Sequence, residues 1–294
     1  MIRLRQAINE AAGTLAAAGI DSARFDAECL AAHSAGVDRG RLTLHQPDEA
    51  FFERYRELVA ARASRIPLQH LMATAPFGPV TLEVGPGVFV PRPETEALLE
   101  WALAQELSES SVVVDLCTGS GALALALAHA RPLARIVAVD DSAEALRYAR
   151  RNSAGSAVVV VEADVTATDV LAEYDGKVAL VVANPPYIPD GAILEPEVAE
   201  HDPPHALFGG PDGMLVIGPI VTLAARLLCS GGRIAVEHDD TTAAQTVAMF
   251  EATGMFGEIT SHRDLTGRPR FVTAVRKGQG LGHDFEREAE RDRA

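Results

Sequence analysis

The sequence predicts an α/β fold in which a mostly parallel, seven-stranded sheet follows a small N-terminal helical domain. Apolar residues repeat at helical spacing through the first third of the chain. After residue 111, short apolar runs alternate with helical stretches, and parallel strands require such crossover connections. A glycine-rich turn directly follows the first of these runs, as it does at the ligand-binding edge of open parallel sheets. We therefore expect a sheet that is covered by helices on both faces.

The helical domain is expected to span residues 1–72. Its first helix carries apolar residues at helical spacing, namely Leu4, Ile8, Ala11 and Leu15. Asp21 or Ser22 can cap a second helix, which ends near Gly36. A third helix starts near Pro47-Asp48. Such a bundle serves either as a substrate-recognition domain or as a packing appendage, and the sequence leaves both interpretations open.

A β-hairpin over residues 73–90 is expected to link this bundle to the sheet. Alternating apolar residues there are interrupted by Gly78-Pro79 and Gly85-Pro86-Gly87, which favour turns. The sheet-bearing domain is then expected at residues 91–277. Residues 278–294 are charged and contain glycine, which predicts a disordered tail.

The sheet is predicted from apolar runs and from the helical stretches between them. The expected strands are Val112–Leu116, Ile136–Asp140, Val158–Val161, Val178–Ala183 and Arg233–Glu237. The expected helices are Gly121–Ala130, Ala143–Asn152 and Ile217–Cys229. A final pair of strands, near Gly257–Arg263 and Arg270–Val275, predicts an antiparallel hairpin at the sheet edge. The segment 188–213 is long, rich in proline and glycine and without periodicity, which favours a lid or a binding loop.

Composition restricts the classes of function. The formal net charge of −15 does not favour tight binding to a phosphate backbone, although a local basic patch on an acidic protein remains compatible with nucleic acid. The cysteines Cys29, Cys117 and Cys229 lie far apart, which fits a reducing compartment and offers neither a zinc site nor a disulfide framework. The chain shows no signal peptide and no apolar stretch near the ~20 residues that span a bilayer. We expect a cytoplasmic protein with no direct binding to nucleic acid or membrane.

The first candidate site is the turn Asp115–Gly121, which follows an apolar strand and opens a helix rich in alanine and leucine. Glycines permit a tight strand-to-helix turn and let a ligand approach the backbone closely. By itself such a turn is weak evidence, because many α/β proteins have one for packing alone. The candidate cofactor-binding residues in it are Asp115, Cys117, Thr118, Gly119, Ser120 and Gly121.

Two further signals indicate an adenosine-containing cofactor. Asp140 ends the next strand, 21 residues beyond Gly119, where an acid can accept hydrogen bonds from both ribose hydroxyls. After the third strand, Asp164 can accept from an adenine amino group and Val165 can pack on the ring, although Asp164 can equally be a helix N-cap. A nicotinamide dinucleotide would use the same ribose contact but prefers a G-x-G-x-x-G turn. Since Asp115 can hold an ammonium group, which a dinucleotide lacks, we expect S-adenosyl-L-methionine, with S-adenosyl-L-homocysteine as product.

The second candidate site is Asn184-Pro185-Pro186-Tyr187, at the carboxyl end of the fourth strand, where ligands bind in open parallel sheets. The two prolines fix φ angles and remove backbone donors, which leaves an edge rich in acceptors. The Asn184 side-chain oxygen and the Pro185 carbonyl can receive both hydrogens of one NH2 group and orient its lone pair toward an activated methyl group. Tyr187 offers an aromatic face to a flat substrate group. We expect Asn184, Pro185, Pro186 and Tyr187 to bind and methylate a planar, amide-type nitrogen, with Asn184 also contacting the cofactor.

Other polar segments are weaker candidates. The segment His201–His205 holds two histidines, but its prolines prevent the helix that would place them on one face. The segment His238-Asp239-Asp240 contains residue types that can bind a metal ion. A solvated loop is the favoured interpretation for both segments, and no metal site is predicted. The charges of Pro91–Glu96 are expected to cap the helix that follows them.

These motifs resemble those of the peptide chain release factor glutamine-N5 methyltransferase family over nearly the whole chain. The matching segments are the helical domain, Pro67–Leu71, Phe89–Glu96, the cofactor turn, Asn184–Ile188 and Ala206–Gly213. Asn-Pro-Pro-Tyr is shared with adenine-N6 methyltransferases, whereas the Pro91–Glu96 motif is more specific. The resemblance implies a Rossmann-like class I methyltransferase fold that uses S-adenosyl-L-methionine. It also implies that peptide chain release factors are the protein partners, methylated on the side-chain amide of the glutamine in their Gly-Gly-Gln loop.

Two residues depart from the family pattern, and two alternatives stay open. Cys117 stands where the family usually has glycine, which is tolerated if φ there is negative. Ala73 replaces a usual glycine before the hairpin, so the turn between the domains is expected to differ. An adenine-N6 nucleic-acid methyltransferase is the enzymatic alternative, because adenine presents the same two hydrogens, but it needs a basic cleft. A non-catalytic protein that retains the fold would predict a damaged turn or a missing Asn184, and neither is seen.

Overall fold

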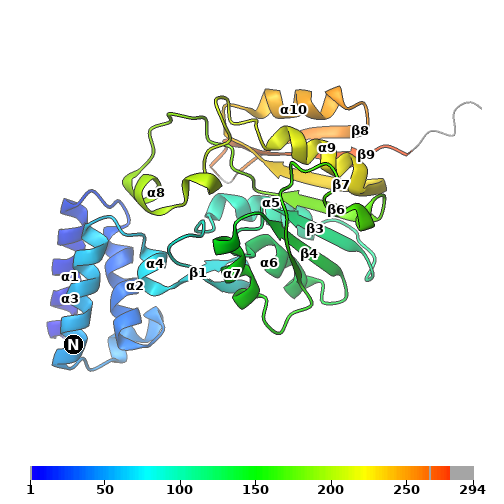
Figure 1. Cartoon of the computed structure of the whole chain (residues 1–294). Helices are drawn as coiled ribbons and strands as arrows, with labels where there is room; N and C mark the ends of the chain where they lie inside the picture. The colour runs from blue at the N-terminus through cyan, green and yellow to red at the C-terminus, as the bar shows by residue number, and fades with distance from the viewer. Residues whose placement is uncertain (1, 265, 279–294) are drawn as a thin grey trace, which may run out of the picture.

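The computed structural model describes residues 2–264 and 266–278 and begins with a bundle of helices (Figure 1). The helices are α1 (Ile2–Ala17), α2 (Ala23–Ala35), α3 (Glu49–Ala63) and the short α4 (Leu68–Met72), with a 3-10 turn at Arg39–Leu44. Buried side chains from α1, α2 and α3 form one apolar core, which includes Leu15, Leu30, Phe51 and Tyr55. The predicted helices are confirmed, and α4 was not predicted. The tail predicted to be disordered lies, from residue 279 on, outside the described residues.

Local capping accounts for where α3 begins, but not for where α2 begins. Asp48 precedes α3, and its side chain accepts a hydrogen bond from the Phe51 amide at 2.7 Å, which satisfies one of the free donors of the first turn. Ser22 takes the N-cap position of α2, but its side chain makes no capping bond. The Ser22 hydroxyl instead bonds to the Asp26 carboxylate at 2.8 Å. The predicted start of α2 is therefore correct, while the predicted cap is not formed.

A two-stranded hairpin connects the bundle to the sheet (Figure 1). β1 (Thr74–Phe77) pairs antiparallel with β2 (Val80–Glu83), and Phe77 lies opposite Val80 across the turn. The hairpin was predicted, although its strands end at Glu83 and the chain up to residue 90 is irregular. Phe77, Leu82, Val88 and Val90 are buried against the same core as α5 and α6, so the hairpin is packed onto the sheet side of the molecule.

The sheet has seven strands in the order β5-β4-β3-β6-β7-β9-β8. The strands are β3 (Val112–Leu116), β4 (Arg135–Asp140), β5 (Val159–Glu162), β6 (Val178–Ala183), β7 (Leu228–Glu237), β8 (Phe256–Arg263) and β9 (Pro269–Arg276). The neighbours from β5 to β7 run parallel, whereas β9 is antiparallel to both β7 and β8. This confirms the predicted mostly parallel, seven-stranded sheet with an antiparallel hairpin at its edge.

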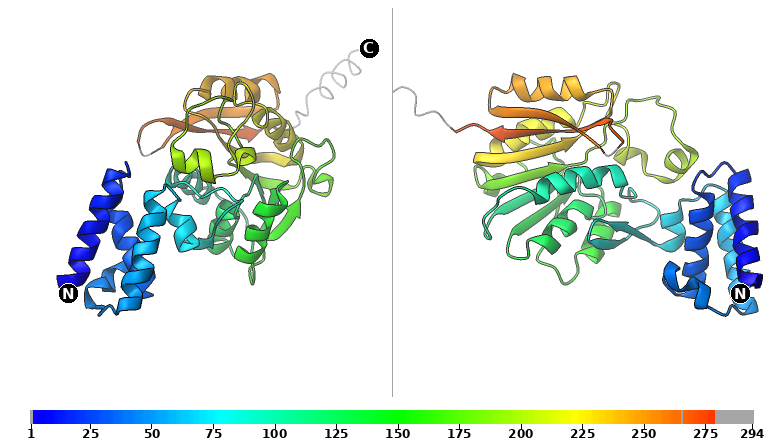
Figure 2. Two further views of the ribbon diagram at one scale, coloured as in Figure 1. Left: turned by 60° about the vertical axis from the view of Figure 1, so that its left-hand side comes forward. Right: turned by 180° about the vertical axis from the view of Figure 1, so that it is seen from behind.

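Helices cover both faces of the sheet, as Figure 2 shows from two sides. The helices are α5 (Glu96–Leu103), α6 (Ala122–Ala130), α7 (Ala143–Asn152), α9 (Ile217–Leu227) and α10 (Ala243–Ala252). Along β3, Val113 packs with α5 and α6 on one face, whereas Val114 packs with α9 and Phe250 of α10 on the other. Successive side chains of a strand point to opposite faces, so a strand that is buried on both sides reads as an unbroken apolar run.

The predicted boundary between α9 and β7 is wrong, because the strand expected to begin at Arg233 begins five residues earlier. The helix expected to reach Cys229 ends at Leu227, and β7 already begins at Leu228. Leu228 pairs with Val178 of β6 and is buried in the core, so strand pairing takes over a residue that continues the helical apolar pattern. Among residues 2–264 and 266–278, no helix has the length and apolar character that crossing a bilayer requires.

Candidate active site

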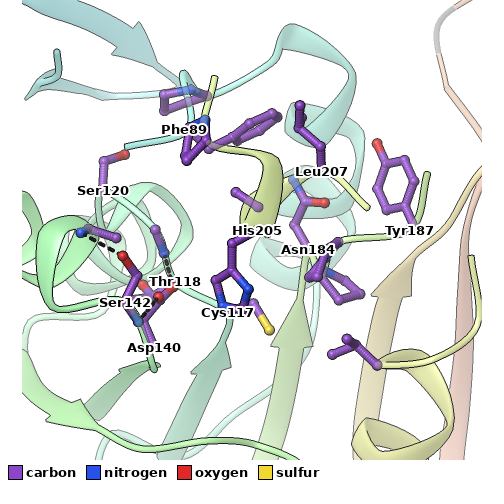
Figure 3. Close-up of a pocket in the computed structure, with 18 of the residues that line it drawn as sticks. Phe89, Cys117, Thr118, Ser120, Asp140, Ser142, Asn184, Tyr187, His205 and Leu207 are labelled. Atoms are coloured by element: carbon purple, nitrogen blue, oxygen red, sulfur yellow. Dashed lines mark hydrogen bonds between the residues drawn. The ribbon is translucent and has the colours of Figure 1, made fainter. Parts of the chain in front are cut away.

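The carboxyl ends of β3, β4, β5 and β6 open into one cavity of about 650 Å³ (Figure 3). The strand order reverses between β3 and β6, which is where ligands bind in open α/β sheets. The volume falls within the range of about 300–1,000 Å³ that is usual for small-molecule sites. Every residue predicted to bind cofactor or acceptor lines this cavity except Gly121, which takes the N-cap position of α6.

Asp115 is the residue before the end of β3, and its side chain is buried below the cavity. Its Oδ2 atom accepts hydrogen bonds from the Thr118 hydroxyl at 2.5 Å and from the Ala124 amide at 3.1 Å. Its Oδ1 atom has no hydrogen-bond partner among the described residues. Burial raises the pKa of Asp115 to about 7, against the lowering effect of those two bonds. An ammonium group beside Oδ1 would satisfy the free acceptor and favour the ionised carboxylate, which fits the methionine end of the expected cofactor.

The turn after Asp115 depends on residues with positive φ. Gly119 and Gly121 have φ of 57° and 89°, and Cys117 also has a φ of 59°. The condition under which Cys117 was expected to be tolerated, a negative φ, is therefore not met. A non-glycine residue in this left-handed region costs roughly 1–2 kcal/mol. Because the Cys117 side chain packs against the sheet core, contacts with the core compensate for this strain.

Asp140 holds the turn Asp115–Gly121 from the end of β4. Its Oδ2 accepts the Gly119 amide at 2.8 Å, and its Oδ1 accepts the Ser142 amide at 2.9 Å; both bonds are dashed in Figure 3. Each carboxylate oxygen has more than one lone-pair site, so both remain able to accept from ribose hydroxyls. Burial raises the pKa of Asp140, while the two amide bonds oppose that shift. The acid predicted to bind ribose therefore also shapes the turn that it faces.

Asp164 and Val165 follow β5 and lie at the next part of the cavity wall. The Asp164 Oδ1 atom accepts from both the amide and the hydroxyl of Thr166, at 2.8 and 2.7 Å. These bonds lower the pKa of Asp164 and form a local turn rather than a helix cap. Its other oxygen makes no bond within the described chain, and Val165 is buried beside it.

The loop Asn184–Tyr187 follows β6 and closes the opposite end of the cavity (Figure 3). Asn184 donates a hydrogen bond from Nδ2 to the Thr95 hydroxyl oxygen at 3.2 Å. The Tyr187 hydroxyl donates to Glu237 Oε1 at 2.8 Å. Burial and the neighbouring Glu237 keep the pKa of Tyr187 well above its ordinary value, so the phenol stays protonated. Both polar ends of the loop are therefore held by residues from other parts of the chain.

Sequence reasoning missed Thr95 and Glu237. Thr95 lies in the segment Pro91–Glu96, of which only the charged residues were considered. Only 4% of the surface of Thr95 is exposed. Glu237 ends β7 with 1% of its surface exposed. Burial raises the pKa of Glu237 to about 7. An acid at the carboxyl end of a parallel strand was available as a signal, but the strand was treated only as part of the sheet.

Glycines in the 188–213 segment allow it to pack directly on the loop Asn184–Tyr187. The amide of Ile188 donates to the Leu207 carbonyl at 2.9 Å, and the amide of Gly209 donates to the Ile188 carbonyl at 2.9 Å. A Cβ atom on Gly209 would lie 2.6 Å from the Pro186 carbonyl oxygen, which no side chain permits. A Cβ atom on Gly213 would lie closer still to the Tyr187 carbonyl oxygen, and Gly213 has a φ of 77°. The backbone of the long segment thus supports the loop from behind.

The same segment also covers part of the cavity. Ile193, Leu194, Val198 and Leu207 line the cavity from this segment, which also contains the unpredicted short helix α8 (Pro196–His201). Figure 1 shows α8 on an excursion of the chain from the sheet toward the helical bundle.

Ion pairs connect the covering segment to three other regions. Arg62 of α3 bonds to Glu197 at 2.9 Å, and Arg65 pairs with both Glu195 and Glu197. Arg92 pairs with Asp202, whose side chain is buried. His205 contacts Asp141, beyond the end of β4, at 2.7 Å, and this contact raises the pKa of His205. The segment is therefore held at the bundle, at the start of α5 and at the cofactor side of the cavity.

The histidines that were considered as metal ligands lie in different settings. His238 is fully buried, so the interpretation as a solvated loop is wrong for this residue, whereas Asp239 is half-buried and Asp240 is exposed. The Nδ1 atom of His238 contacts the Asp239 carbonyl at 2.7 Å. The chain turns back there from β7, and the His238 amide bonds to the Arg270 carbonyl of β9 at 3.0 Å. His201 ends α8 and faces His70 edge to face, with ring centroids 6.4 Å apart. Within the described ranges, no group of side chains has the composition of a metal site.

Comparisons with known proteins match both halves of the chain. Residues 6–72 match the model of the PrmC N-terminal domain, and residues 81–201 match the model of the methyltransferase small domain. A release factor glutamine methyltransferase of Mycolicibacterium smegmatis is 66% identical over 94% of this chain and 99% of its own. One from Mycobacterium tuberculosis is 62% identical over 94% of this chain and 92% of its own.

A more distant relative carries a different name. The 4-amino-L-phenylalanine/4-methylamino-L-phenylalanine methyltransferase of Streptomyces pristinaespiralis is 40% identical over 93% of this chain and 95% of its own. The level of identity to the two mycobacterial proteins is well above that value. With a methyltransferase domain, a matching N-terminal domain and these full-length relatives, the chain belongs to the release factor glutamine methyltransferase family.

Proposed function

We propose that this chain transfers a methyl group from S-adenosyl-L-methionine to the side-chain amide nitrogen of the glutamine in the Gly-Gly-Gln loop of peptide chain release factors. The observation that supports this most directly is the orientation of Asn184. Its Nδ2 is engaged by Thr95, so its Oδ1 is the atom left to accept from a substrate NH2 group. The mycobacterial relatives at 62–66% identity are named for this substrate class.

The residues proposed to hold the cofactor lie at the ends of β3, β4 and β5, and Asn184 after β6 is proposed to contact it as well. Asp115 offers its free Oδ1 to the ammonium group, Asp140 accepts from the ribose hydroxyls, and Asp164 and Val165 receive the adenine. The remaining turn residues Cys117, Thr118, Gly119, Ser120 and Gly121 shape the backbone against the cofactor. When bound, the cofactor supplies an electrophilic methyl group next to Asn184.

The residues proposed to act on the acceptor work by orientation rather than as a strong base. An amide nitrogen is a poor nucleophile because its lone pair is conjugated with the carbonyl group. Asn184 Oδ1 and the Pro185 carbonyl each accept one of its hydrogens, which turns the lone pair toward the methyl group and stabilises the positive charge that develops on nitrogen. Pro186 fixes the backbone, and Tyr187 lies along the flat amide. The cavity is lined mainly by apolar side chains at this end, which strengthens these polar contacts.

The helical domain of residues 1–72 is proposed to contact the body of the release factor. A Gly-Gly-Gln loop can thread into a narrow cleft, because glycine has no side chain to obstruct it. Free glutamine would lack the contacts made by the rest of the protein. We therefore expect an intact release factor to react much faster than free glutamine or a short peptide.

The experiment that tests this proposal offers competing acceptors with labelled cofactor. Intact release factor, free glutamine, 4-amino-L-phenylalanine and adenine-containing duplex DNA are incubated separately with the enzyme. Peptide mapping by mass spectrometry should place one methyl group on the glutamine of the Gly-Gly-Gln peptide. Label on DNA or on 4-amino-L-phenylalanine, and none on the release factor, would reject the proposed substrate. A release factor whose loop glutamine is replaced by asparagine serves as the matched control.

A further inference from the structure

A buried carboxyl group lies behind the catalytic loop and is not used by the proposed reaction. Glu237 accepts a hydrogen bond from the Tyr187 hydroxyl at 2.8 Å through Oε1. The other oxygen, Oε2, has no partner of normal hydrogen-bond geometry among the described residues. The Thr95 hydroxyl nevertheless lies close enough to lower the pKa of Glu237. The carboxyl group therefore faces both residues that hold the ends of the loop.

The amide of Asn184 has two possible orientations in the same space. Rotation by half a turn about the last side-chain bond exchanges Oδ1 and Nδ2. Only the orientation with Oδ1 toward the cavity offers an acceptor to a substrate NH2 group. The observed bond from Nδ2 to Thr95 corresponds to that orientation. A hydroxyl can both donate and accept, so Thr95 by itself does not distinguish the two orientations.

We propose that Glu237 and Thr95 are positioning residues that fix the Asn184 amide with its oxygen facing the acceptor. An ionised carboxylate only accepts hydrogen bonds, so Glu237 draws the hydroxyl hydrogens of both Thr95 and Tyr187 toward itself. Thr95 then presents only lone pairs to Asn184, and Asn184 must donate through Nδ2. This inference rests on the proposed function, because it concerns how the same loop is oriented.

The protonation state of Glu237 should therefore control the amide. Burial raises the pKa of Glu237 to about 7; the hydrogen bond from Tyr187, the nearby Thr95 hydroxyl and the charge of Arg270 oppose the shift, and Glu94 adds to it. When Glu237 is protonated, its own hydrogen can be given to Thr95. The Thr95 hydrogen is then free to point at Asn184, and the wrong amide orientation becomes accessible. Turnover at saturating cofactor should rise as the pH increases through about 7.

A pair of substitutions at Thr95 gives the sharpest test. Thr95→Val keeps the shape but removes the hydroxyl, whereas Thr95→Ser keeps the hydroxyl. We expect kcat for release factor methylation to fall roughly 3- to 10-fold in Thr95→Val, the range of one hydrogen bond, and to stay near wild type in Thr95→Ser. Cofactor affinity, measured by calorimetry, should stay the same in both. Thr246→Val replaces another fully buried hydroxyl, on α10, and is the matched control for folding.

Glu237→Gln tests the proton-dependent part. Glutamine always carries hydrogens, so this variant should behave like the protonated enzyme, with a low and flat pH profile of kcat. Asp115 also titrates near pH 7, but its loss of charge should change cofactor affinity rather than kcat at saturation. Because Glu237 acts through Thr95, the double variant Thr95→Val/Glu237→Gln should lose no more than the larger single loss.

Several outcomes would overturn the inference. Thr95→Val with full activity, or equal losses in Thr95→Val and Thr95→Ser, would show that the hydroxyl does not orient Asn184. A double variant whose loss is the product of the single losses would show that Glu237 does not act through Thr95. If Glu237→Gln does not fold, the activities of Thr95→Val and Thr95→Ser and the pH profile of the wild-type enzyme still test the proposal. These results concern variants relative to wild type, so they remain separate from whether wild type methylates a release factor at all.

Discussion

The two ends of the cavity are built by different kinds of contact. One end, proposed to bind the cofactor and called the cofactor end, is shaped by hydrogen bonds between residues 3, 9 and 21 positions apart. These bonds run from Thr118 and Ala124 to Asp115, and from Gly119 to Asp140. The other end, proposed to bind the methyl acceptor and called the acceptor end, is shaped by hydrogen bonds between residues 50 and 89 positions apart. These bonds run from Tyr187 to Glu237 and from Asn184 to Thr95. The covering segment adds a bond across 132 positions, from Arg65 to Glu197. A cofactor site made by two adjacent turns can be kept intact by short motifs, whereas an acceptor site of this kind depends on how the whole chain is packed.

This difference predicts that substitutions at the two ends will change different quantities. Residues of the acceptor end should affect turnover with little change in cofactor binding. Residues of the cofactor end should affect cofactor affinity first. Substitutions that break contacts of the 188–213 segment should change how often that segment opens locally, more than they change turnover or cofactor affinity.

The largest effect is expected for Asn184→Ala. The substitution removes the acceptor that we propose for the reacting nitrogen, and losing one preorganised polar group of this kind costs roughly 10²- to 10³-fold in kcat. Cofactor affinity from calorimetric titration should change much less, because the cofactor turn does not depend on Asn184. A variant with near-normal kcat, or one in which cofactor affinity falls as far as kcat, would contradict the separation of the two ends.

Asp140→Ala should show the opposite pattern. We expect S-adenosyl-L-methionine affinity to fall by about 1.5–3 kcal/mol, the range for hydrogen bonds to a charged group, which corresponds to roughly 10- to 150-fold. Glu162→Ala is the matched control, since Glu162 lies opposite Asp140 on β5 but is exposed and pairs with Arg150. Unchanged affinity in Asp140→Ala, with Glu162→Ala as the reference, would remove Asp140 from the proposed site.

The same difference explains which parts could be predicted from the sequence. The strands β3, β4 and β6, the turn after Asp115 and the acid at position 140 are each specified by a few neighbouring residues, and all were located correctly. Thr95 and Glu237 were missed because their importance arises only when β7 and the start of α5 come next to the loop after β6. The acid at the end of β7 was a signal for Glu237 as a candidate residue, but no pattern within either segment signals its contact with the loop.

The short helix α8 and the strain at Cys117 could not be predicted from the sequence, for other reasons. α8 has six residues, begins with Pro196 and buries no residue completely, so it has no apolar periodicity to detect. Its position depends on charge pairing with Arg62 and Arg65 of another region. A positive φ at a cysteine cannot be read from residue type, because cysteine rarely adopts it.

Glu197→Gln tests the covering segment with an intermediate effect. The change removes the charge that pairs with Arg62 and Arg65, although those arginines keep Asp26 and Glu195 as partners. We expect hydrogen exchange of backbone amides in residues 188–201 to become about 5- to 10-fold faster, in keeping with a loss of about 1 kcal/mol in local opening. Global stability should change less than this local value.

A matched control lies on the same helix. Glu200 is exposed and forms no ion pair with another described residue, so Glu200→Gln makes the same change of charge without breaking a contact. Exchange in Glu200→Gln should match wild type. Equal acceleration in both variants would mean that net charge, rather than the pairing with α3, determines how the segment is held.

The smallest effect is expected at Ala73, which shares a feature with the cofactor turn. Cys117 and Ala73 both have positive φ, 59° and 56°, and both were singled out as positions where glycine is usual. The Cys117 side chain packs against the core, whereas Ala73 is an exposed cap of α4, so no packing offsets its strain. Ala73 adopts the left-handed conformation that glycine adopts readily. A glycine could therefore form the same turn, although we expected the turn to differ because alanine stands there.

Ala73→Gly should therefore stabilise the protein. Relief of about 1–2 kcal/mol of left-handed strain is partly offset by the greater freedom of glycine in the unfolded chain, which costs roughly 0.5–1 kcal/mol. We expect a net gain of about 0.5–1 kcal/mol in the free energy of unfolding, measured by urea denaturation. Ala60→Gly makes the same chemical change at an exposed position inside α3, where φ is helical, and should instead destabilise by roughly 0.5–1 kcal/mol. Because the two variants differ only in local backbone conformation, opposite signs would identify strain at Ala73 as the cause, and a loss of stability in both would show that the turn there carries none.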